Sequence, residues 1–406
     1  MSSKNPRGII ELGNIKIKCI IFKIDESNNS EILSTAVIQS EGIHNGVIVN
    51  FDKASKAIRS CIAAAEKKAK VSIKKINVLI EQPEFICTKF SKYKKIDGSK
   101  IEKEDINFLL KEGKKQVTHN DENQSIIHIF NHNYIVDGKS FIEEPINIYA
   151  NSLSHEMTFV TAPKNNLKNI KEVFIDCDIE VERFISSTFA LGAELLNEDQ
   201  LDSGSILIDL GFEKISLGLF KNLALVHSVT LPIGINHIVK DISKVCSLSK
   251  EESEVIKNKI DYSFINNANM FDENNYLKEN YFKDSYPRKL SQSLILNILQ
   301  ARLDEILEMI KKQVLISGLS FGNNIFITGG GSRLINIETY FSNFLKLNVK
   351  KLSGKNEDDK KKNFYEAFNS CIGAFKIIQN GWETEAIPQS FNKSDEKKGF
   401  FAKIFG

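Results

Sequence analysis

The chain has 406 residues, of which 42% are hydrophobic and 26% are charged, and its formal net charge is +2. This length and average composition suit two or three folded domains and argue against wholesale disorder. The near-neutral charge argues against a dedicated nucleic-acid-binding protein. No run approaches the ~18 apolar residues that span a bilayer, and the polar N-terminus lacks the apolar core of a signal peptide.

In chain order, residues 8–13 lead through a turn at Gly13 and Asn14 into 15–22, where apolar residues and lysines alternate as in a strand. Residues 52–70 carry an apolar helical stripe, and 77–81 read as a strand. Residues 84–163 combine a charged helix at 101–117 with short strands around 128–136, which indicates an inserted subdomain. A helix is expected at 164–178.

The opening pattern returns in the second half of the chain. Residues 9–13 and 207–211 both read apolar–apolar–acid–Leu–Gly, at an offset of 198 residues, and each leads into an alternating strand. The repeat predicts two similar α/β domains, with chance similarity of two hairpins as the alternative. Helices are expected at 249–259, 292–313 and 364–379, a loop at 266–285, and a flexible linker at 383–396.

Acid-x-Gly at a strand–turn–strand corner suits phosphate binding, because glycine lets backbone N–H groups approach phosphate oxygens. Glu11 and Asp209 stand at the two strand ends, where they can hold Mg²⁺ directly or through water. A strand at 324–328 runs into Gly329, Gly330 and Gly331 and is expected to open a helix, whose N-terminus favours anions. The alternatives are ordinary hairpins and glycines retained for packing.

The six cysteines are scattered without a C-x-x-C pair, which predicts reduced, mostly buried thiols and not a disulfide framework or zinc site. His128 and His132 are four residues apart, but in the strand expected at 126–136 that spacing does not converge on one metal. A surface or core role is therefore favoured for both.

The order of these motifs resembles the ATPase superfamily of actin, heat-shock chaperones and sugar kinases, and more narrowly the FtsA family. The narrower match is carried by residues 42–48, 134–138, 231–241, 251–257 and 301–306 together with the Phe-rich C-terminus, and it covers nearly the whole chain. The resemblance implies an α/β fold of two actin-like (RNase H-like) domains around a nucleotide cleft, with an inserted FtsA-type subdomain. It places the first domain at 1–83 and 164–190, the inserted subdomain at 84–163, the second domain at 191–362, a returning helix at 363–382, the linker at 383–396 and a membrane-targeting tail at 397–406.

The resemblance also implies a site for ATP and Mg. Asp209 and Glu11 are the acids assigned to the metal, and the positions assigned to the nucleotide are Gly13, Asn14, Gly211, Phe212, Gly234, Glu254, Lys257, Gly329, Gly330 and Gly331. The family usually has Asp at Glu11, Ser or Thr at Asn14, and two more glycines where this chain has Phe212 and Glu213. A β-carbon obstructs the approach of phosphate, and Glu213 repels it unless Lys214 or Mg²⁺ compensates. In the hinge, Ile235 and Asn236 replace the usual Gly and Asp. These departures predict weak or absent ATP turnover.

The last ten residues read as an amphipathic anchor. At helical spacing the apolar residues pair at i, i+4 and the lysines supply positive charge; the residues are Lys397, Lys398, Phe400, Phe401, Lys403, Ile404 and Phe405. The alternatives are a tail that docks on its own protein and a frayed end.

The favoured function is that of an FtsA-like scaffold, peripheral on the cytoplasmic face of the inner membrane at the division site. Its expected partners are the FtsZ C-terminal peptide, further copies of the chain in a filament, the anionic membrane surface and later divisome proteins. In the family the FtsZ peptide docks on the subdomain of helix 292–313, where Arg302 can pair with an acidic peptide or belong to a solvated face. The rivals are a superfamily kinase, which needs intact phosphate loops, and an FtsA-like pilus-assembly adaptor, which resembles the family without this tail.

Overall fold

The computed structural model describes residues 6–24, 30–141, 143–263, 269–318, 324–352, 359–380 and 385–386. The chain folds into two compact units. Unit 1 comprises residues 1–205, 218–230 and 353–406, and unit 2 comprises residues 206–217 and 231–352. The chain therefore passes between the units at several points, one of them directly after Thr230.

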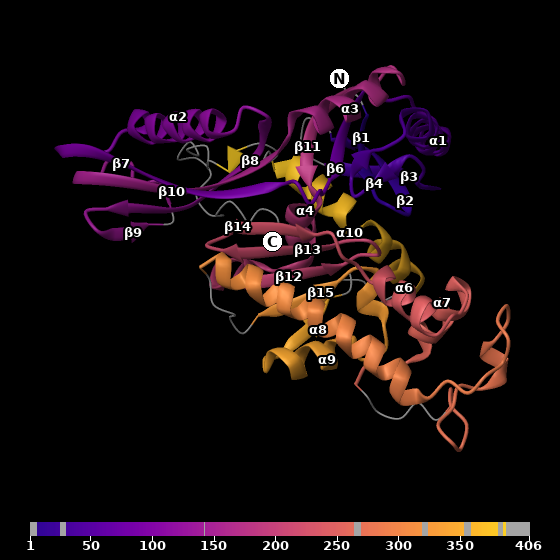
Figure 1. Ribbon diagram of the computed structural model, residues 1–406. Helices are drawn as coiled ribbons and strands as arrows, with labels where there is room; N and C mark the ends of the chain where they lie inside the picture. The colour runs from indigo at the N-terminus through magenta and orange to yellow at the C-terminus, as the bar shows by residue number, and fades with distance from the viewer. Residues whose placement is uncertain are drawn as a thin grey trace. The chain divides into compact units, whose positions relative to one another are not determined.

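Unit 1 contains a five-stranded sheet of order β11-β6-β1-β2-β3 (Figure 1). Strands β1, β2 and β3 are antiparallel, whereas β6 and β11 run parallel to β1. The strands are β1 (Arg7–Leu12), β2 (Lys16–Ile24), β3 (Ser30–Gln39), β6 (Lys75–Ile80) and β11 (Glu180–Ser186), with a small hairpin of β4 (Ile43–His44) and β5 (Val47–Ile48). The alternation expected at 15–22 is confirmed only at the start of β2, where Lys16 is exposed and Ile17 is buried. Ile15 is 36% exposed, and residues 19–22 are all buried because both faces of the strand are covered there.

Helices pack against this sheet along their apolar stripes. They are α1 (Phe51–Ala69), α3 (Lys164–Ile175), α4 (Ser187–Leu195) and α10 (Asp359–Asn380), and the short helix α5 (Glu198–Ser203) follows α4 in the chain. The α1 stripe buries Ala54, Ile58, Cys61 and Ala65, and Asn50 caps the helix by accepting a hydrogen bond from the Lys53 N–H. Helix α10 packs on α4 and on β1 and β2, so the returning helix expected at the C-terminus belongs to unit 1.

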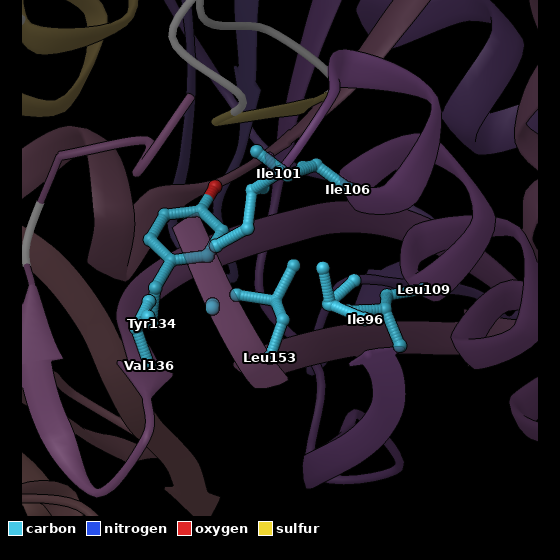
Figure 2. Packing of buried hydrophobic residues seen from close by; sticks show 8 residues of the cluster. Ile96, Ile101, Ile106, Leu109, Tyr134, Val136 and Leu153 are labelled. Atoms are coloured by element: carbon cyan, nitrogen blue, oxygen red, sulfur yellow. The ribbon is translucent and has the colours of Figure 1, made fainter. Parts of the chain in front are cut away.

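The inserted subdomain is a second sheet of order β17-β8-β10-β7, with β9 also paired to β8 and α2 packed alongside (Figure 1). Its elements are β7 (Ile86–Lys100), α2 (Lys103–Asn120), β8 (Gln124–Val136), β9 (Lys139–Phe141), β10 (Tyr149–Pro163) and β17 (Glu385–Ala386). Figure 2 shows its core, in which Ile96, Leu109, Tyr134 and Leu153 point toward one another. The strands β7, β8 and β10 are longer than the short strands expected here.

The third sheet has the order β14-β13-β12-β15-β16. Its strands are β12 (Ser205–Leu210), β13 (Ile215–Lys221), β14 (Ala224–Leu231), β15 (Ile325–Thr328) and β16 (Val349–Lys351). Residues 218–230, in β13 and β14, belong to unit 1. Unit 2 contains α6 (Asn236–Val245), α7 (Lys250–Lys259), α8 (Gln292–Ile316), α9 (Ile337–Leu345) and the short 3₁₀ turns η1 (Glu279–Tyr281) and η2 (Gly330–Arg333).

The repeat predicted from sequence is confirmed by topology. From edge to edge, the first and third sheets both carry three consecutive strands in reverse chain order, followed by two later strands. In each sheet the strand that bears the acid-x-Gly motif is central and pairs in parallel with the fourth strand, β1 with β6 and β12 with β15. The chain is thus an α/β protein built on a duplicated actin-like unit with an inserted subdomain.

Several boundaries differ from those expected. Residues 218–230 and 353–362, which the sequence placed in the second domain, belong to unit 1. Unit 2 begins at Ile206, whereas the sequence placed the second domain from residue 191; α4 and α5 instead belong to unit 1. Within the expected flexible linker, Glu385 and Ala386 form a short strand that pairs in parallel with Ile129 and Phe130 of β8. The edge of β8 supplies the hydrogen-bonding partner, which the linker sequence does not reveal. The remainder of 383–396 and the tail at 397–406 lie outside the described residues.

All six cysteines are free thiols, and Cys19, Cys61, Cys246 and Cys371 are buried. His128 is a core residue: its side chain is 1% exposed, and its Nε2 accepts a hydrogen bond of 2.9 Å from the Ser186 N–H. The core role proposed for this histidine is therefore confirmed.

Candidate functional site

The first loop connects β1 and β2 and carries Glu11, Gly13 and Asn14. Glu11 lies opposite Lys18 in the antiparallel register, and the Lys18 Nζ donates to its carboxylate at 2.7 Å. This ion pair already compensates the carboxylate that the sequence assigned to Mg²⁺. Asn14 pairs with Asn45 of the β4–β5 hairpin through two hydrogen bonds, of 2.7 and 3.0 Å. The first loop is therefore fixed to the hairpin within unit 1.

The two acid-x-Gly turns have the same local geometry. A β-carbon on Gly13 would stand 2.6 Å from the Lys16 carbonyl oxygen, and one on Gly211 would stand 2.5 Å from the Lys214 carbonyl oxygen. Both separations are shorter than a carbon–oxygen van der Waals contact, so each turn requires glycine to bring the backbone this close. The hairpins themselves therefore need these two glycines, and their close approach to phosphate stays a prediction.

Asp209 and the glycine run meet at the carboxyl ends of neighbouring parallel strands. Asp209 lies opposite Thr328 in the β12–β15 register. A β-carbon on Gly329, whose φ is +85°, would stand 2.1 Å from the Asp209 Oδ1. The structure thus brings together two of the residues that the sequence assigned to one nucleotide site.

The three glycines have different surroundings. A β-carbon on Gly330 would meet nothing within 4 Å, whereas one on Gly331 would stand 2.4 Å from Ile235 Cγ1 and 2.8 Å from Leu210 Cβ. Gly330 therefore lines open space beside Asp209 and Gly329, while Gly331 is required for packing. The helix expected to open here is instead η2, a single 3₁₀ turn, and α9 begins only at Ile337. The prediction of a helix N-terminus at the glycine run was wrong.

Phe212 and Glu213 replace the glycines expected in the second loop. Phe212 is 37% exposed at the turn. The Glu213 carboxylate accepts hydrogen bonds from the Asn236 Nδ2 at 2.6 Å and the Lys240 Nζ at 3.0 Å. Burial opposes ionisation of Glu213, but the hydrogen bonds from Lys240 and Asn236 outweigh it and lower the pKa of the carboxyl. The cation that compensates Glu213 is thus Lys240 of α6, which the sequence reasoning missed.

The hinge segment packs directly on the second loop within unit 2. The Ile235 N–H donates to the Gly211 carbonyl at 3.0 Å, and the Asn236 N–H donates to the Phe212 carbonyl at 2.8 Å. A β-carbon on Gly234 would stand 2.3 Å from the same Phe212 oxygen. Gly234 therefore makes a backbone-to-backbone contact that fixes the turn beside the assigned phosphate positions.

Glu254 and Lys257 lie one turn apart on α7, as expected, and form an ion pair with Nζ and Oε1 2.7 Å apart. The lysine side chain is 5% exposed and the glutamate side chain 41% exposed. The pair therefore presents Glu254 at the surface and holds Lys257 beneath it. This arrangement suits a polar contact to a ligand by Glu254 more than by the lysine.

Arg302 on α8 has partners within the chain. Its Nε and Nη2 donate to the two Asp241 carboxylate oxygens on α6 at 2.6 and 2.9 Å, and its Nη1 pairs with Glu305. The guanidinium thus links residues 231–241 to residues 301–306, two of the segments in which the sequence resembles the FtsA family. The Arg302 side chain is only 22% exposed, so it does not lie on a plainly solvated helix face.

A buried carboxylate that the sequence reasoning missed lies just beyond β6. Glu81 is 3% exposed and accepts hydrogen bonds from the Ser186 Oγ, the Thr188 N–H and the Thr230 Oγ1, at 2.8, 2.9 and 3.1 Å. An acidic residue that ends an apolar strand was the available signal. Its neighbour Gln82 donates to the Gly46 carbonyl at 2.6 Å.

Within the described ranges, no group of three or more His, Cys, Asp or Glu side chains is placed to hold a metal ion. In the same part of the chain, none of the helices is both long and apolar enough to cross a membrane. The seven residues assigned to the tail, from Lys397 to Phe405, are outside the described residues.

Two family models match the chain. The model of the cell division protein FtsA matches residues 206–370, and the model of the SHS2 domain inserted in FtsA matches residues 84–161. The second range coincides with the inserted sheet from β7 to β10. Together the two ranges cover more than half of the chain.

Curated relatives agree with these models. The chain is 25% identical over 364 residues to the cell division protein FtsA of Agrobacterium fabrum, covering 86% of this chain and 82% of the relative. It is also 25% identical over 350 residues to the cell division protein FtsA of Bacillus subtilis, covering 84% and 77%.

Solved structures support the fold. The PilM–PilN type IV pilus biogenesis complex matches with a TM-score of 0.61 at 10% identity over 90% of this chain and 96% of the other. MreB5 of Spiroplasma citri bound to ADP matches with a TM-score of 0.54 at 13% identity, over 93% and 98%. The chain belongs to the FtsA family of cell-division proteins.

Proposed function

We propose that this chain is a cell-division scaffold that polymerises on the cytoplasmic face of the inner membrane, at the division site. It tethers FtsZ filaments through their C-terminal peptide and recruits later divisome proteins. The observation that carries the proposal is the combination, in one chain, of the duplicated actin-like sheets with an inserted subdomain at residues 84–161 that matches the FtsA-specific model. A superfamily kinase does not need this inserted subdomain.

The proposed ligand is ATP with Mg. Asp209 would hold the cation, and Gly329 and Gly330 would face the phosphates, because Gly330 lines open space next to the carboxylate. Gly13, Asn14, Gly211, Phe212, Gly234, Glu254 and Lys257 complete the proposed contacts, with Glu11 as a secondary acid. The metal supplies charge neutralisation of the phosphates when it is bound.

Turnover of ATP is expected to be weak. Phe212 occupies the second loop with a bulky ring, and Glu213 is held as a carboxylate by Lys240 and Asn236. Because Lys240 compensates the Glu213 carboxylate, the obstruction that remains is the Phe212 ring, which stands where a glycine would let phosphate approach the backbone. Binding without efficient hydrolysis suits a scaffold whose assembly depends on nucleotide occupancy and not on rapid cycling.

The proposed membrane contact is the C-terminal tail. Partial burial of three phenylalanines and one isoleucine contributes roughly 4–7 kcal/mol, each lysine near anionic lipid adds about 1 kcal/mol, and ordering the helix costs several kcal/mol. A single tail is therefore a marginal anchor, whereas a filament that carries many tails binds by avidity. This dependence links membrane binding to polymerisation.

The proposed contact for the FtsZ peptide is Arg302. Two of its nitrogens remain with Asp241, while the third pairs with Glu305, whose side chain is 53% exposed. A carboxylate of the peptide can replace Glu305 at low cost, since exposed ion pairs contribute little to stability. Arg302 then bridges α6 and the peptide without losing Asp241.

The membrane proposal is tested by co-sedimentation with anionic liposomes. Deleting residues 397–406, or changing Phe400 and Phe401 to Ser, should leave a folded protein that stays in the supernatant. The matched control is Phe391→Ser, which removes a phenylalanine from the preceding linker and should pellet like the unchanged chain. Equal pelleting of all these proteins would contradict the proposed anchor.

A further inference from the structure

Glu81 joins three separate segments of unit 1. Its carboxylate accepts from the Ser186 hydroxyl at the N-cap of α4, from the Thr188 N–H in the first turn of that helix, and from the Thr230 hydroxyl near the end of β14. Ser186 and Thr230 are 105 and 149 residues away in sequence. A buried carboxylate held by hydroxyl and N–H donors specifies the position of each donor, because losing one leaves a buried polar atom unsatisfied.

The group of hydrogen bonds around Glu81, here called the Glu81 node, is also connected to the first loop. Gln82, the next residue, donates to the Gly46 carbonyl at 2.6 Å, and a β-carbon on Gly46 would stand 2.5 Å from the Glu81 carbonyl oxygen. Asn45, adjacent to Gly46, exchanges two hydrogen bonds with Asn14. A continuous series of short polar contacts therefore runs from Asn14 to Glu81 within unit 1.

Two of the points where the chain passes between the units lie next to residues of the Glu81 node. Thr230 is the last residue of unit 1 before the segment that enters unit 2, and it donates to Glu81. Gly218 is the first residue of unit 1 after the preceding passage, and a β-carbon there would stand 2.6 Å from the Thr188 Cγ2. Glu81 thus bonds to Thr230, where one segment leaves unit 1, and to the backbone of Thr188, whose side chain lies beside Gly218 at the other passage.

The segment after Thr230 in turn determines the second loop. Residues 231–236 reach Gly211 and Phe212 through the Ile235 and Asn236 N–H groups, at 3.0 and 2.8 Å. From Thr230 the chain runs through residues 231–234 to Ile235 and Asn236, so covalent links complete the path from the first loop to the second.

We propose that Glu81 is a positioning residue that couples the conformation of the first loop, through Thr230, to the hinge segment and the second loop. The proposal deepens the proposed function, on which it rests for the nucleotide that would act on both loops. A change at Asn14 should therefore alter the local stability of the backbone at Ile235 and Asn236. If Glu81 only satisfied the N-terminus of α4, no such remote effect would follow.

The test is hydrogen exchange of the Ile235 and Asn236 amides in the full chain without nucleotide. Thr230→Val removes one hydroxyl with little change in volume and should speed their exchange about fivefold, the change expected for one lost hydrogen bond. Thr230→Ser keeps the hydroxyl and should restore slow exchange. The matched control is Thr158→Val, because the Thr158 hydroxyl donates to the Val226 carbonyl on the same strand, β14, at 3.3 Å.

Asn14→Ala tests the effect of a change in the first loop. It should also speed hydrogen exchange of the Ile235 and Asn236 amides. The proposal is overturned if Thr158→Val acts as strongly as Thr230→Val, if Thr230→Ser fails to restore protection, or if Asn14→Ala has no effect on these amides. A separate arm adds ATP and Mg to the unchanged chain. Absence of any response there counts against nucleotide binding, while the coupling is decided by the variants alone.

Discussion

A buried carboxylate, Glu252 on α7, organises the loop that precedes α8. It is 1% exposed and accepts from the N–H groups of Lys283, Asp284 and Ser285 at 2.7, 2.8 and 2.9 Å. Its second oxygen accepts from the Ser249 N–H at 2.7 Å and the Ser285 hydroxyl at 2.6 Å. Glu252→Gln replaces one acceptor oxygen by an NH₂ group, so the Ser249 N–H loses its partner while the Ser285 hydroxyl can rotate.

The magnitude follows from these contacts. Leaving one buried N–H unpaired and weakening the remaining bonds by removing the charge costs about 2 kcal/mol, which is close to thirtyfold in a local opening equilibrium. The amides of residues 283–285 should therefore exchange about thirtyfold faster in Glu252→Gln, as measured by mass spectrometry. The control is Glu251→Gln, which removes an equal charge from the same helix turn at an exposed position. Exchange in Glu252→Gln within threefold of this control would refute the reasoning.

The pH dependence has a definite sign. Burial alone raises the pKa of Glu252, but the hydrogen bonds from Ser285, Ser249 and Asp284 overcome it and lower the pKa to about 2. Because the folded value lies below the unfolded value of about 4.3, the ionised form stabilises the loop above pH ~4.3, and this contribution is lost as the pH falls toward about 2. As the pH falls across that window, the exchange rates of the 283–285 amides in Glu252→Gln and in the unchanged chain should therefore converge.

Four further substitutions test single positions. Gly373→Ala places a β-carbon 1.8 Å from the Ala190 carbonyl oxygen, so it should destabilise unit 1 by about 1–3 kcal/mol in urea unfolding despite the better helix propensity of Ala; a raised midpoint would argue against close α10–α4 packing. Gly329→Ala should lower the thermal stability of unit 2 by about 1–3 kcal/mol, because φ is +85° and the new methyl group meets Asp209. Gly330→Ala, which meets nothing within 4 Å, should stay within about 0.5 kcal/mol of the unchanged chain, and an equal loss at both positions would contradict the assigned surroundings. Asp209→Asn should weaken binding of a fluorescent ATP analogue with Mg but not without it, and identical affinities in both conditions would remove Asp209 as the metal acid.

The duplicated architecture was predictable because it depends on local patterns. Alternation at the start of β2, the repeated turn glycines Gly13 and Gly211, and the helical stripe of α1 are each set by residues within one or two turns. The glycine run after β15 was located correctly, but its helix was not. Gly331 is occupied in packing against Ile235, about 96 positions earlier in the chain, so the backbone closes a 3₁₀ turn there.

The details of the site depended on pairs that sequence spacing does not reveal. Glu213 and Lys240 are 27 residues apart, and Arg302 and Asp241 are 61 apart. Either residue of each pair reads as a surface charge until the fold brings its partner within hydrogen-bonding distance. The pairing of Glu385 and Ala386 with β8 was missed for the same reason, since it depends on an available strand edge and not on strand-forming residues.

The central claim is that one chain links FtsZ to the membrane. The most direct measurement is recruitment of a fluorescent FtsZ C-terminal peptide to anionic liposomes, with the full chain, with the chain lacking residues 397–406, and with Arg302→Ala. We expect the peptide to sediment only with the full chain. The shortened chain should bind the peptide in solution, and Arg302→Ala should bind liposomes without recruiting the peptide. Peptide that fails to bind the full chain, or that sediments equally with the shortened one, would contradict the account.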